Sequence, residues 1–284
     1  MTRKKSTILT LHEKKRSGDP ITMVTAYDYP CALAAERAGL DAILVGDSLG
    51  MVVLGYDSTT PVTMEEMLHH CRAVRRGASL PFLVGDMPFM SYQADRAEAV
   101  RNAGRFLKEA GMDAVKLEGG REVAPAVNAI SDAGITVVGH LGLTPQSAAK
   151  LGGYGVQART AEGAVRLLED ALILQEAGAE MLVLEKVPDR VAARVSQALR
   201  IPTIGIGAGA GCDGQVLVLH DMVGLFDRFT PRFVKRYAEL LHEMERALGA
   251  YRDDVASRRF PGTEHAFSMD DAEWDRWVGG PGAP

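Results

Sequence analysis

The stretch "AILVGDSLGM" (residues 42–51) joins an apolar run to a glycine and then to an aspartate, Asp47. The stretch "PFLVGDMPFM" (residues 81–90) repeats this order and places Asp86 after its own apolar run and glycine. Apolar runs without polar alternation are typical of strands buried on both faces, as in parallel sheets. The repeat therefore predicts two buried parallel strands that each end on a carboxylate.

Six further runs of the same kind bring the number of predicted strands to eight. Seven of the eight lack clean polar alternation; the eight runs are residues 21–27, 41–47, 80–86, 113–119, 135–140, 180–185, 201–207 and 215–221. Helical segments are expected between most of them, including residues 63–77, 93–110, 121–133 and 161–177. Thr63 with Glu66 forms a capping box at the first of these helices. Thr230 followed by Pro231 predicts a last helix that runs to about residue 248.

Eight strands with intervening helices in 284 residues predict a single (β/α)8 barrel. An open doubly wound sheet is the alternative. No linker interrupts the pattern, so residues 1–284 are expected to form one domain. A polar tail from about residue 250 would cover a neighbouring surface or be partly disordered.

Composition and charge argue against several classes of protein. The net charge is −5 and no basic stripe occurs, which argues against a nucleic-acid partner. The chain lacks an apolar run of about 18 residues, so no membrane span is expected. Its basic N-terminus has no apolar core of a secretory signal. Three well-separated cysteines, Cys31, Cys71 and Cys212, fit a reducing compartment, and a cytoplasmic location is expected.

Polar side chains gather where the predicted strands end. In a barrel, these positions surround the active site, and they hold Asp47, Ser48, Asp86, Lys116, Glu118, His140 and Glu185. Each also has a structural interpretation. The aspartates could be helix N-caps, and Lys116 and Glu118 could form a structural ion pair. His140 could be a structural histidine or could donate a hydrogen bond to a residue that itself binds the metal or substrate. Glu185 could pair with Lys186 or Arg190 at the surface.

Carboxylates around one opening favour a magnesium site. Mg²⁺ prefers hard oxygen ligands, needs only one or two carboxylates and keeps several waters. No cluster of His and Cys has zinc spacing, and the run His69-His70-Cys71 is interpreted as structural because neighbours on a helix point in different directions.

Two glycine-containing loops accompany these strand ends. Residues 204–214, "IGIGAGAGCDG", lack the Gly-Lys-Ser/Thr of a phosphate loop and a following helix, so nucleotide binding is not expected. Close approach of the backbone to a ligand is favoured there over a tight turn. Residues 140–158 form a long loop that could act as a lid.

Taken in order, the motifs resemble those of the ketopantoate hydroxymethyltransferase family. They include "LVGDSLGMVVLGYDSTTPVTMEEM", "GDMPFMSY", "VKLEGG", "GHLGLTPQS", "LVLEKVP" and "IGIGAGAGCDGQVLVLHD". The resemblance covers about residues 20–267, whereas "SMDDAEWDRWVGGPGAP" extends beyond it.

The resemblance implies a Mg²⁺-dependent barrel of the phosphoenolpyruvate mutase/isocitrate lyase type. It implies transfer of a one-carbon unit from 5,10-methylenetetrahydrofolate to 3-methyl-2-oxobutanoate through a Mg-bound enolate, which gives ketopantoate for pantothenate biosynthesis. A cytoplasmic homo-oligomer, often a decamer, is implied as well. By resemblance, Asp47, Asp86 and Glu118 are metal ligands, and Asp47, Ser48, Asp86 and Lys116 contact the substrate. Glu185 is the catalytic base.

Other functions stay open at this point. A related Mg-dependent lyase or aldolase acting on 2-oxo acids would use the same metal chemistry, although the Lys-Lys-Cys-Gly-His loop of such lyases does not occur in the sequence. A barrel that only binds ligands is a further alternative, and it is disfavoured by the complete acidic set.

Overall fold

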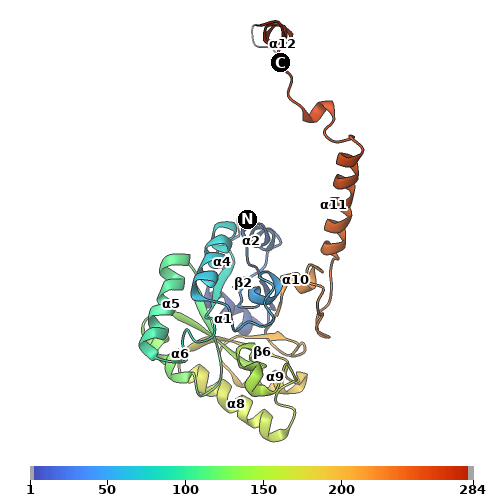
Figure 1. Ribbon diagram of the computed structural model, residues 1–284. Coiled ribbons are helices and arrows are strands. Elements are labelled where there is room, and N and C mark those ends of the chain that lie inside the picture. Colours follow the sequence, from blue (N-terminus) through green and yellow to red (C-terminus); the bar gives the residue numbers. More distant parts are fainter. Residues whose placement is uncertain (1–2, 281–284) are drawn as a thin grey trace.

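The computed structural model describes residues 3–280 and contains a closed barrel of eight parallel strands. Each strand pairs with its neighbours in sequence, and β8 closes the ring by pairing with β1 (Figure 1). The strands are β1 (Ile21–Thr25), β2 (Ala42–Val45), β3 (Phe82–Asp86), β4 (Ala114–Glu118), β5 (Thr136–Gly142), β6 (Ala179–Glu185), β7 (Thr203–Ile206) and β8 (Gly214–Leu217). All eight predicted strands are present, so the predicted barrel is confirmed.

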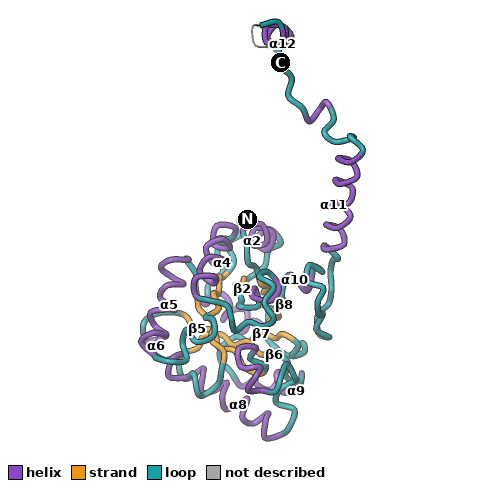
Figure 2. The backbone as a smooth tube through the Cα atoms, in the orientation of Figure 1, coloured by secondary structure: helices purple, strands orange, loops and turns teal. Residues whose placement is uncertain are grey.

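Most helices lie around this barrel, as Figure 2 shows by colour, and the last two extend away from it. The helices are α1 (Ile8–Ser17), α2 (Tyr29–Arg37), α3 (Leu49–Val52), α4 (Met64–Gly77), α5 (Arg96–Ala110), α6 (Ala124–Asp132), α7 (Ala148–Leu151), α8 (Ala161–Glu176), α9 (Asp189–Ala198), α10 (Leu219–Met222), α11 (Leu240–Ala256) and α12 (Asp271–Val278). Short 3-10 turns lie at Pro145–Ser147 and Thr263–His265. The capping box of Thr63 and Glu66 is present at the start of α4. Within residues 3–280, no helix is long and apolar enough to cross a membrane.

The inside of the barrel changes in character along its axis. Alternate residues of each strand point inward, and the apolar ones form one buried cluster with members from all eight strands: Ile21, Met23, Ala42, Leu44, Phe82, Val84, Ala114, Val138, Met181, Val183, Ile204, Ile206 and Val216. Continuing the same alternation towards the C-terminal ends gives Asp86, Lys116, Glu118, His140 and Glu185. The polar residues therefore lie at the C-terminal end of the barrel, directly next to the apolar cluster that fills its interior.

Helix α1, which was not predicted, closes the opposite end. Its Leu11 is almost fully buried and belongs to the cluster inside the barrel. Lys14 contacts Asp41 at 2.7 Å and Lys15 contacts Asp213 at 2.7 Å, so ion pairs at the N-terminal ends of β2 and β8 hold the helix in place. The N-terminal basic residues thus serve the fold.

The helix predicted from Thr230 to about residue 248 was wrong at its start. Residues 231–239 are not helical, and α11 begins at Leu240. The backbone amides of Tyr237, Leu240 and Leu241 donate to carbonyls of residues 222–224. These hydrogen bonds tie the segment to α10, and they outweigh the local helix-start signal of Thr230 and Pro231.

Beyond this segment the chain leaves the barrel. Figure 1 shows α11 and α12 extending away from it in orange and red. Neither helix contains a buried residue. The tail therefore begins structurally near residue 240 and consists largely of helix up to residue 280.

Candidate active site

A cavity of about 420 Å³ opens at the C-terminal ends of the strands. Its polar lining includes all of the residues predicted from the strand ends: Asp47, Ser48, Asp86, Lys116, Glu118, His140 and Glu185. They come from five consecutive strands or the turns that follow them. The prediction that these side chains share one opening is therefore confirmed.

Three of the residues form a compact acidic cluster. One carboxylate oxygen from each of Asp47, Asp86 and Glu118 lies within 4.8 Å of the other two. All three side chains are buried, and the backbone amide of Asp47 donates to Asp86 Oδ2 at 3.1 Å. Such a cluster has the chemistry of a site for a divalent metal ion.

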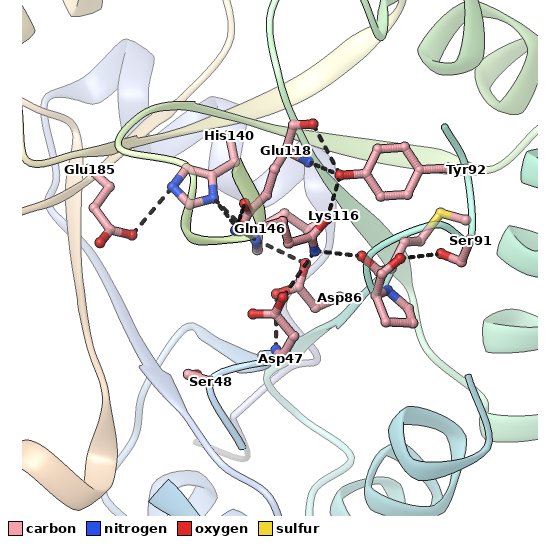
Figure 3. Close-up of polar contacts among 12 residues, drawn as sticks. Asp47, Ser48, Asp86, Ser91, Tyr92, Lys116, Glu118, His140, Gln146 and Glu185 are labelled. Atoms are coloured by element: carbon pink, nitrogen blue, oxygen red, sulfur yellow. Dashed lines mark hydrogen bonds and ion pairs between the residues drawn. The ribbon is translucent and has the colours of Figure 1, made fainter. Parts of the chain in front are cut away.

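Lys116 lies beside this cluster, as Figure 3 shows. Its Nζ atom is 2.9 Å from Asp86 Oδ1 and 3.6 Å from Glu118 Oε1. Strand register explains this arrangement, because Asp86 pairs with Lys116 across β3 and β4. The single positive charge of Lys116 does not balance the three buried carboxylates, so the cluster carries an excess of negative charge.

The pKa values of the three carboxyls reflect that excess. Burial raises the pKa of Asp47 well above its usual range, and the nearby charges of Asp86 and Glu118 raise it further. Burial also raises the pKa of Asp86, although Lys116 partly offsets the effect. Burial would do the same to Glu118, but Lys116 and His140 outweigh it and lower the Glu118 pKa. A divalent cation would relieve the repulsion between the carboxylates.

His140 connects the acidic cluster to Glu185. Its Nδ1 atom lies 3.3 Å from Glu118 Oε1 and 3.2 Å from Lys116 Nζ, and its Nε2 atom lies 3.4 Å from Glu185 Oε2. Burial and Lys116 lower the pKa of His140, but Glu118 and Glu185 outweigh them and raise it to about 9. His140 therefore contacts three predicted site residues, Lys116, Glu118 and Glu185.

Glu185 is the more accessible carboxylate of the group. Its side chain is 16% exposed, compared with 2% for Glu118. It ends β6, where the backbone amide of Leu143 donates to its carbonyl oxygen at 2.8 Å. The adjacent Gly142 has a φ of +91°, and a Cβ there would lie 2.2 Å from the same carbonyl, so only glycine fits.

Ser48 lies at the side of the cavity. It is half-buried, and its hydroxyl is hydrogen-bonded to that of Tyr27 at 2.8 Å. The Tyr27 hydroxyl is buried, which raises its pKa, so it stays protonated. This contact fixes the orientation of the Ser48 side chain beside Asp47.

Gln146 belongs to the site but was not predicted as a site residue. Its side-chain amide donates to Asp47 Oδ2 at 2.9 Å and to the Met87 carbonyl at 3.0 Å. Its backbone amide donates to Glu118 Oε2 at 3.0 Å, and its Oε1 accepts from the Tyr92 hydroxyl at 2.8 Å. It lies in the 3-10 turn Pro145–Ser147 beyond the end of β5, and neither strand-end position nor ligand spacing predicted it.

The cavity continues outward from the acidic cluster between apolar walls. The outer part is lined by side chains including Tyr154, Phe226, Phe229 and Phe233. Asp221, which follows β8, is a further lining residue that was not predicted. The predicted lid, residues 140–158, contributes Leu143, Pro145 and Tyr154 to these walls.

The glycine-rich loop at residues 204–214 packs mainly against protein. A Cβ at Gly209 would lie 2.5 Å from Asp189, and one at Gly211 would lie 2.5 Å from Ala193. Within this stretch only Ile206 lines the cavity. Gly209 and Gly211 therefore pack closely against α9, and close approach of this loop to a ligand stays a prediction.

The fold and the cluster together define a class of protein, a (β/α)8 barrel with a buried cluster of three carboxylates at its C-terminal mouth. Residues 5–263 match the family described as ketopantoate hydroxymethyltransferase. A 3-methyl-2-oxobutanoate hydroxymethyltransferase from Moorella thermoacetica is 58% identical over 93% of this chain and 98% of its own. One from Syntrophobacter fumaroxidans is 59% identical over 89% and 90%. The chain belongs to this family.

Solved structures of lower identity share the barrel. A phosphoenolpyruvate phosphomutase from Streptomyces platensis superposes with a TM-score of 0.61 at 15% identity, covering 95% of this chain and 94% of its own. A 2,3-dimethylmalate lyase of the phosphoenolpyruvate mutase/isocitrate lyase superfamily gives 0.58 at 16% identity over 95% and 94%. These similarities show that the fold of this chain, a (β/α)8 barrel, is shared with both proteins.

Proposed function

We propose that the chain transfers a one-carbon unit from 5,10-methylenetetrahydrofolate to 3-methyl-2-oxobutanoate and so forms 2-dehydropantoate (ketopantoate). The observation that carries the proposal is the buried cluster of Asp47, Asp86 and Glu118 beside Lys116, within a chain of this family. The reaction requires a proton to be removed from C3 of a 2-oxo acid. That step needs positive charge at the keto oxygen and a base near C3.

Mg²⁺ is the ion that best fits the cluster. The donors are all carboxylate oxygens, which Mg²⁺ prefers. Asp86 Oδ1 is buried and, among residues 3–280, has no partner in hydrogen-bonding geometry, although Lys116 Nζ lies 2.9 Å away. Asp47, Asp86 and Glu118 would hold the ion directly or through water. When bound, it would act as a Lewis acid toward the keto and carboxylate oxygens of the substrate.

Lys116 and Ser48 are suited to bind the keto acid. Lys116 presents a buried ammonium group, which attracts the substrate carboxylate and remains charged because neighbouring carboxylates raise its pKa. Ser48, fixed by Tyr27, offers a hydroxyl at the side of the cavity. These contacts would orient C3 of the keto acid toward Glu185.

Glu185 is the base in this proposal. Its carboxylate accepts the C3 proton. His140 orients the Glu185 side chain through the 3.4 Å contact between His140 Nε2 and Glu185 Oε2. The C3 carbon then bonds to the methylene carbon, the two bonds from that carbon to the folate nitrogens break, and water supplies the hydroxyl oxygen. The two freed nitrogens take up the proton removed from C3 and the remaining proton of the water. A base positioned in this way contributes about 10²–10⁴-fold to the rate.

The proposed location and assembly follow the family. Within residues 3–280 all three cysteines are free, which fits the cytoplasm. Helix α11 has an exposed apolar side and no buried residue, which fits a homo-oligomer in which it packs against another copy. The number of copies by family resemblance is ten.

Product analysis tests the proposed function. The full chain is incubated with both substrates and Mg²⁺, and ketopantoate is measured by mass spectrometry with and without a chelator. Product that requires both folate and metal supports the proposal. Cleavage of a 2-oxo acid without use of folate would instead identify the related lyase or aldolase.

A further inference from the structure

Part of the cavity lining has no role in the chemistry assigned so far. The acidic cluster, Lys116 and Glu185 line the cavity from the C-terminal ends of β2, β3, β4 and β6. A volume of about 420 Å³ falls in the range of about 300–1,000 Å³ that holds drug-sized ligands, and a keto acid of five carbons fills only part of it. A second and larger substrate therefore has room in the same cavity.

Asp221 is a carboxylate in this unassigned part of the lining. It is 8% exposed and lines the cavity at the end of α10. Among residues 3–280 no hydrogen bond or ion pair to its carboxylate is found. Buried carboxylates are rarely left without a donor, so a ligand with hydrogen-bond donors is the natural partner.

The nearby arginine does not satisfy Asp221. Arg236 donates instead to Glu239 at 2.8 Å and to Thr230 at 2.7 Å. Burial raises the pKa of Asp221 to about 6, and the charge of Arg236 only partly opposes the shift. At neutral pH the carboxylate is therefore ionised and can accept two hydrogen bonds.

Three phenylalanine side chains line the same cavity as Asp221. They are Phe226, Phe229 and Phe233, and they come from the segment that follows α10. Phe229 is 61% exposed, whereas Phe233 packs against the apolar cluster inside the barrel. Flat apolar faces and one ionised acceptor in the same cavity match a planar heterocycle that carries paired donors on one edge.

We propose that Asp221 and these phenylalanines bind the pterin ring of the folate. The ring's 2-amino group and the adjacent ring N–H are two donors side by side, and a carboxylate accepts both in bidentate geometry. The phenyl rings pack against the faces of the heterocycle. This assignment rests on the proposed function, because it presupposes that a folate enters the cavity.

The test is a binding titration with two folates. Tetrahydrofolate and its 2-desamino analogue are titrated anaerobically, by calorimetry, into the full chain with Mg²⁺ and keto acid present. Wild-type protein should bind tetrahydrofolate about 10- to 100-fold more tightly, because the analogue lacks one charge-assisted hydrogen bond. Asp221→Asn should bind tetrahydrofolate more weakly by a similar factor and should no longer distinguish the two ligands.

Two further variants complete the design. Phe229→Ala should weaken both folates equally, because packing on a ring face does not sense the amino group. Asp227→Asn removes an exposed carboxylate that does not line the cavity, and it should keep the wild-type preference. Retention of that preference by Asp221→Asn would overturn the assignment. Failure of wild-type protein to bind tetrahydrofolate or form ketopantoate would instead overturn the proposed function as well.

Discussion

Asp86 faces both the acidic cluster and Lys116, so its replacement separates metal binding from folding. Asp86→Asn keeps the size of the side chain but removes a negative charge next to a buried lysine. Loss of a residue that only supports a metal ligand typically lowers metal affinity about 10- to 100-fold. Because Asp86 is proposed as a ligand itself, the Mg²⁺ affinity of this variant should fall by more than that. Competition with Mn²⁺, followed by electron paramagnetic resonance, measures this. A folded variant with unchanged metal affinity would show that Asp86 is not a ligand.

Glu185 can be tested without the folate. With Mg²⁺ in D₂O, wild-type enzyme should exchange the C3 hydrogen of 3-methyl-2-oxobutanoate, which nuclear magnetic resonance detects directly. Glu185→Gln is nearly isosteric but cannot accept the proton, so exchange should fall by about 10²–10⁴-fold. Affinity for the keto acid should change little. Exchange near the wild-type rate would assign the base to another group, such as His140.

Gln146 should act on metal affinity through the two carboxylates that it positions. Gln146→Leu removes the hydrogen bonds to Asp47 and Tyr92 while retaining the backbone donor to Glu118. Mg²⁺ affinity should fall by about 10- to 100-fold, as expected for loss of a residue that orients metal ligands.

A neighbouring glutamine supplies the control. Gln93 contacts Gln146 at 3.3 Å but touches none of the three carboxylates. Gln93→Leu should therefore keep metal affinity close to that of the wild type. An equal loss in both variants would attribute the effect to general packing of the loop, and the positioning role of Gln146 would be rejected.

At the level of elements, the strands were predictable and the loops were not. Buried parallel strands are apolar throughout, so all eight could be recognised, and convergence of their C-terminal ends brought Asp47, Asp86, Glu118 and Glu185 together. The role of Gln146 in the site was not predictable, because its contacts with Asp47 and Glu118 depend on the path of the chain after β5. Helix α1 was not predicted because Leu11 is its only buried residue, so it has no apolar repeat at helical spacing, although Thr7 caps its start.

The error at Thr230 has a similar origin. A threonine followed by proline is a sound local signal for a helix start. The helix nevertheless begins only at Leu240, because the amides of Tyr237, Leu240 and Leu241 donate to carbonyls at the end of α10. Such contacts between distant residues are not visible in the local sequence. The same segment places Phe229 and Phe233 over the cavity.

Attachment of α1 to the barrel gives a prediction about stability. Asp41 accepts hydrogen bonds from Lys14 Nζ at 2.7 Å and from the Thr22 amide and hydroxyl at 2.8 Å each. Asp41→Asn should lower the free energy of unfolding at pH 7 by about 1–3 kcal/mol. Urea denaturation measures the change, and Asp19→Asn, which removes an exposed carboxylate nearby, is the control.

The pH dependence of that difference follows from the Asp41 pKa. Burial would raise this pKa, but the hydrogen bonds from Lys14 and Thr22 outweigh burial and hold it below the usual 3.8. A lowered folded-state pKa means that the stabilisation is fully present above the unfolded-state pKa and is lost as pH falls through the folded-state pKa. Wild type and Asp41→Asn should therefore differ equally at pH 7 and pH 5 and converge only in strong acid. Convergence by pH 5 would rule out this role for Asp41.

At the scale of the whole molecule, α11 is a long helix whose apolar side stays exposed within the described residues 3–280. Exposed apolar side chains recur along it at helical spacing: Leu240, Met244, Leu248, Tyr251 and Val255. A stripe of this kind on an isolated helix is costly to leave in water and marks a protein contact. Figure 1 shows that the barrel of the same chain does not cover it. A second copy of the chain is the occupant expected for the proposed homo-oligomer.

The double variant Met244→Glu with Leu248→Glu tests this arrangement, because two charges in the centre of the stripe oppose burial against another copy. Sedimentation equilibrium should show a lower mass than for the wild type. Arg246→Glu changes charge on the same helix outside the stripe and should leave the mass unchanged. The active site lies in the barrel rather than in α11, so dissociated subunits should still bind the keto acid with Mg²⁺. An unaltered oligomer in the double variant would mean that α11 does not hold the copies together and that its apolar side meets a different partner.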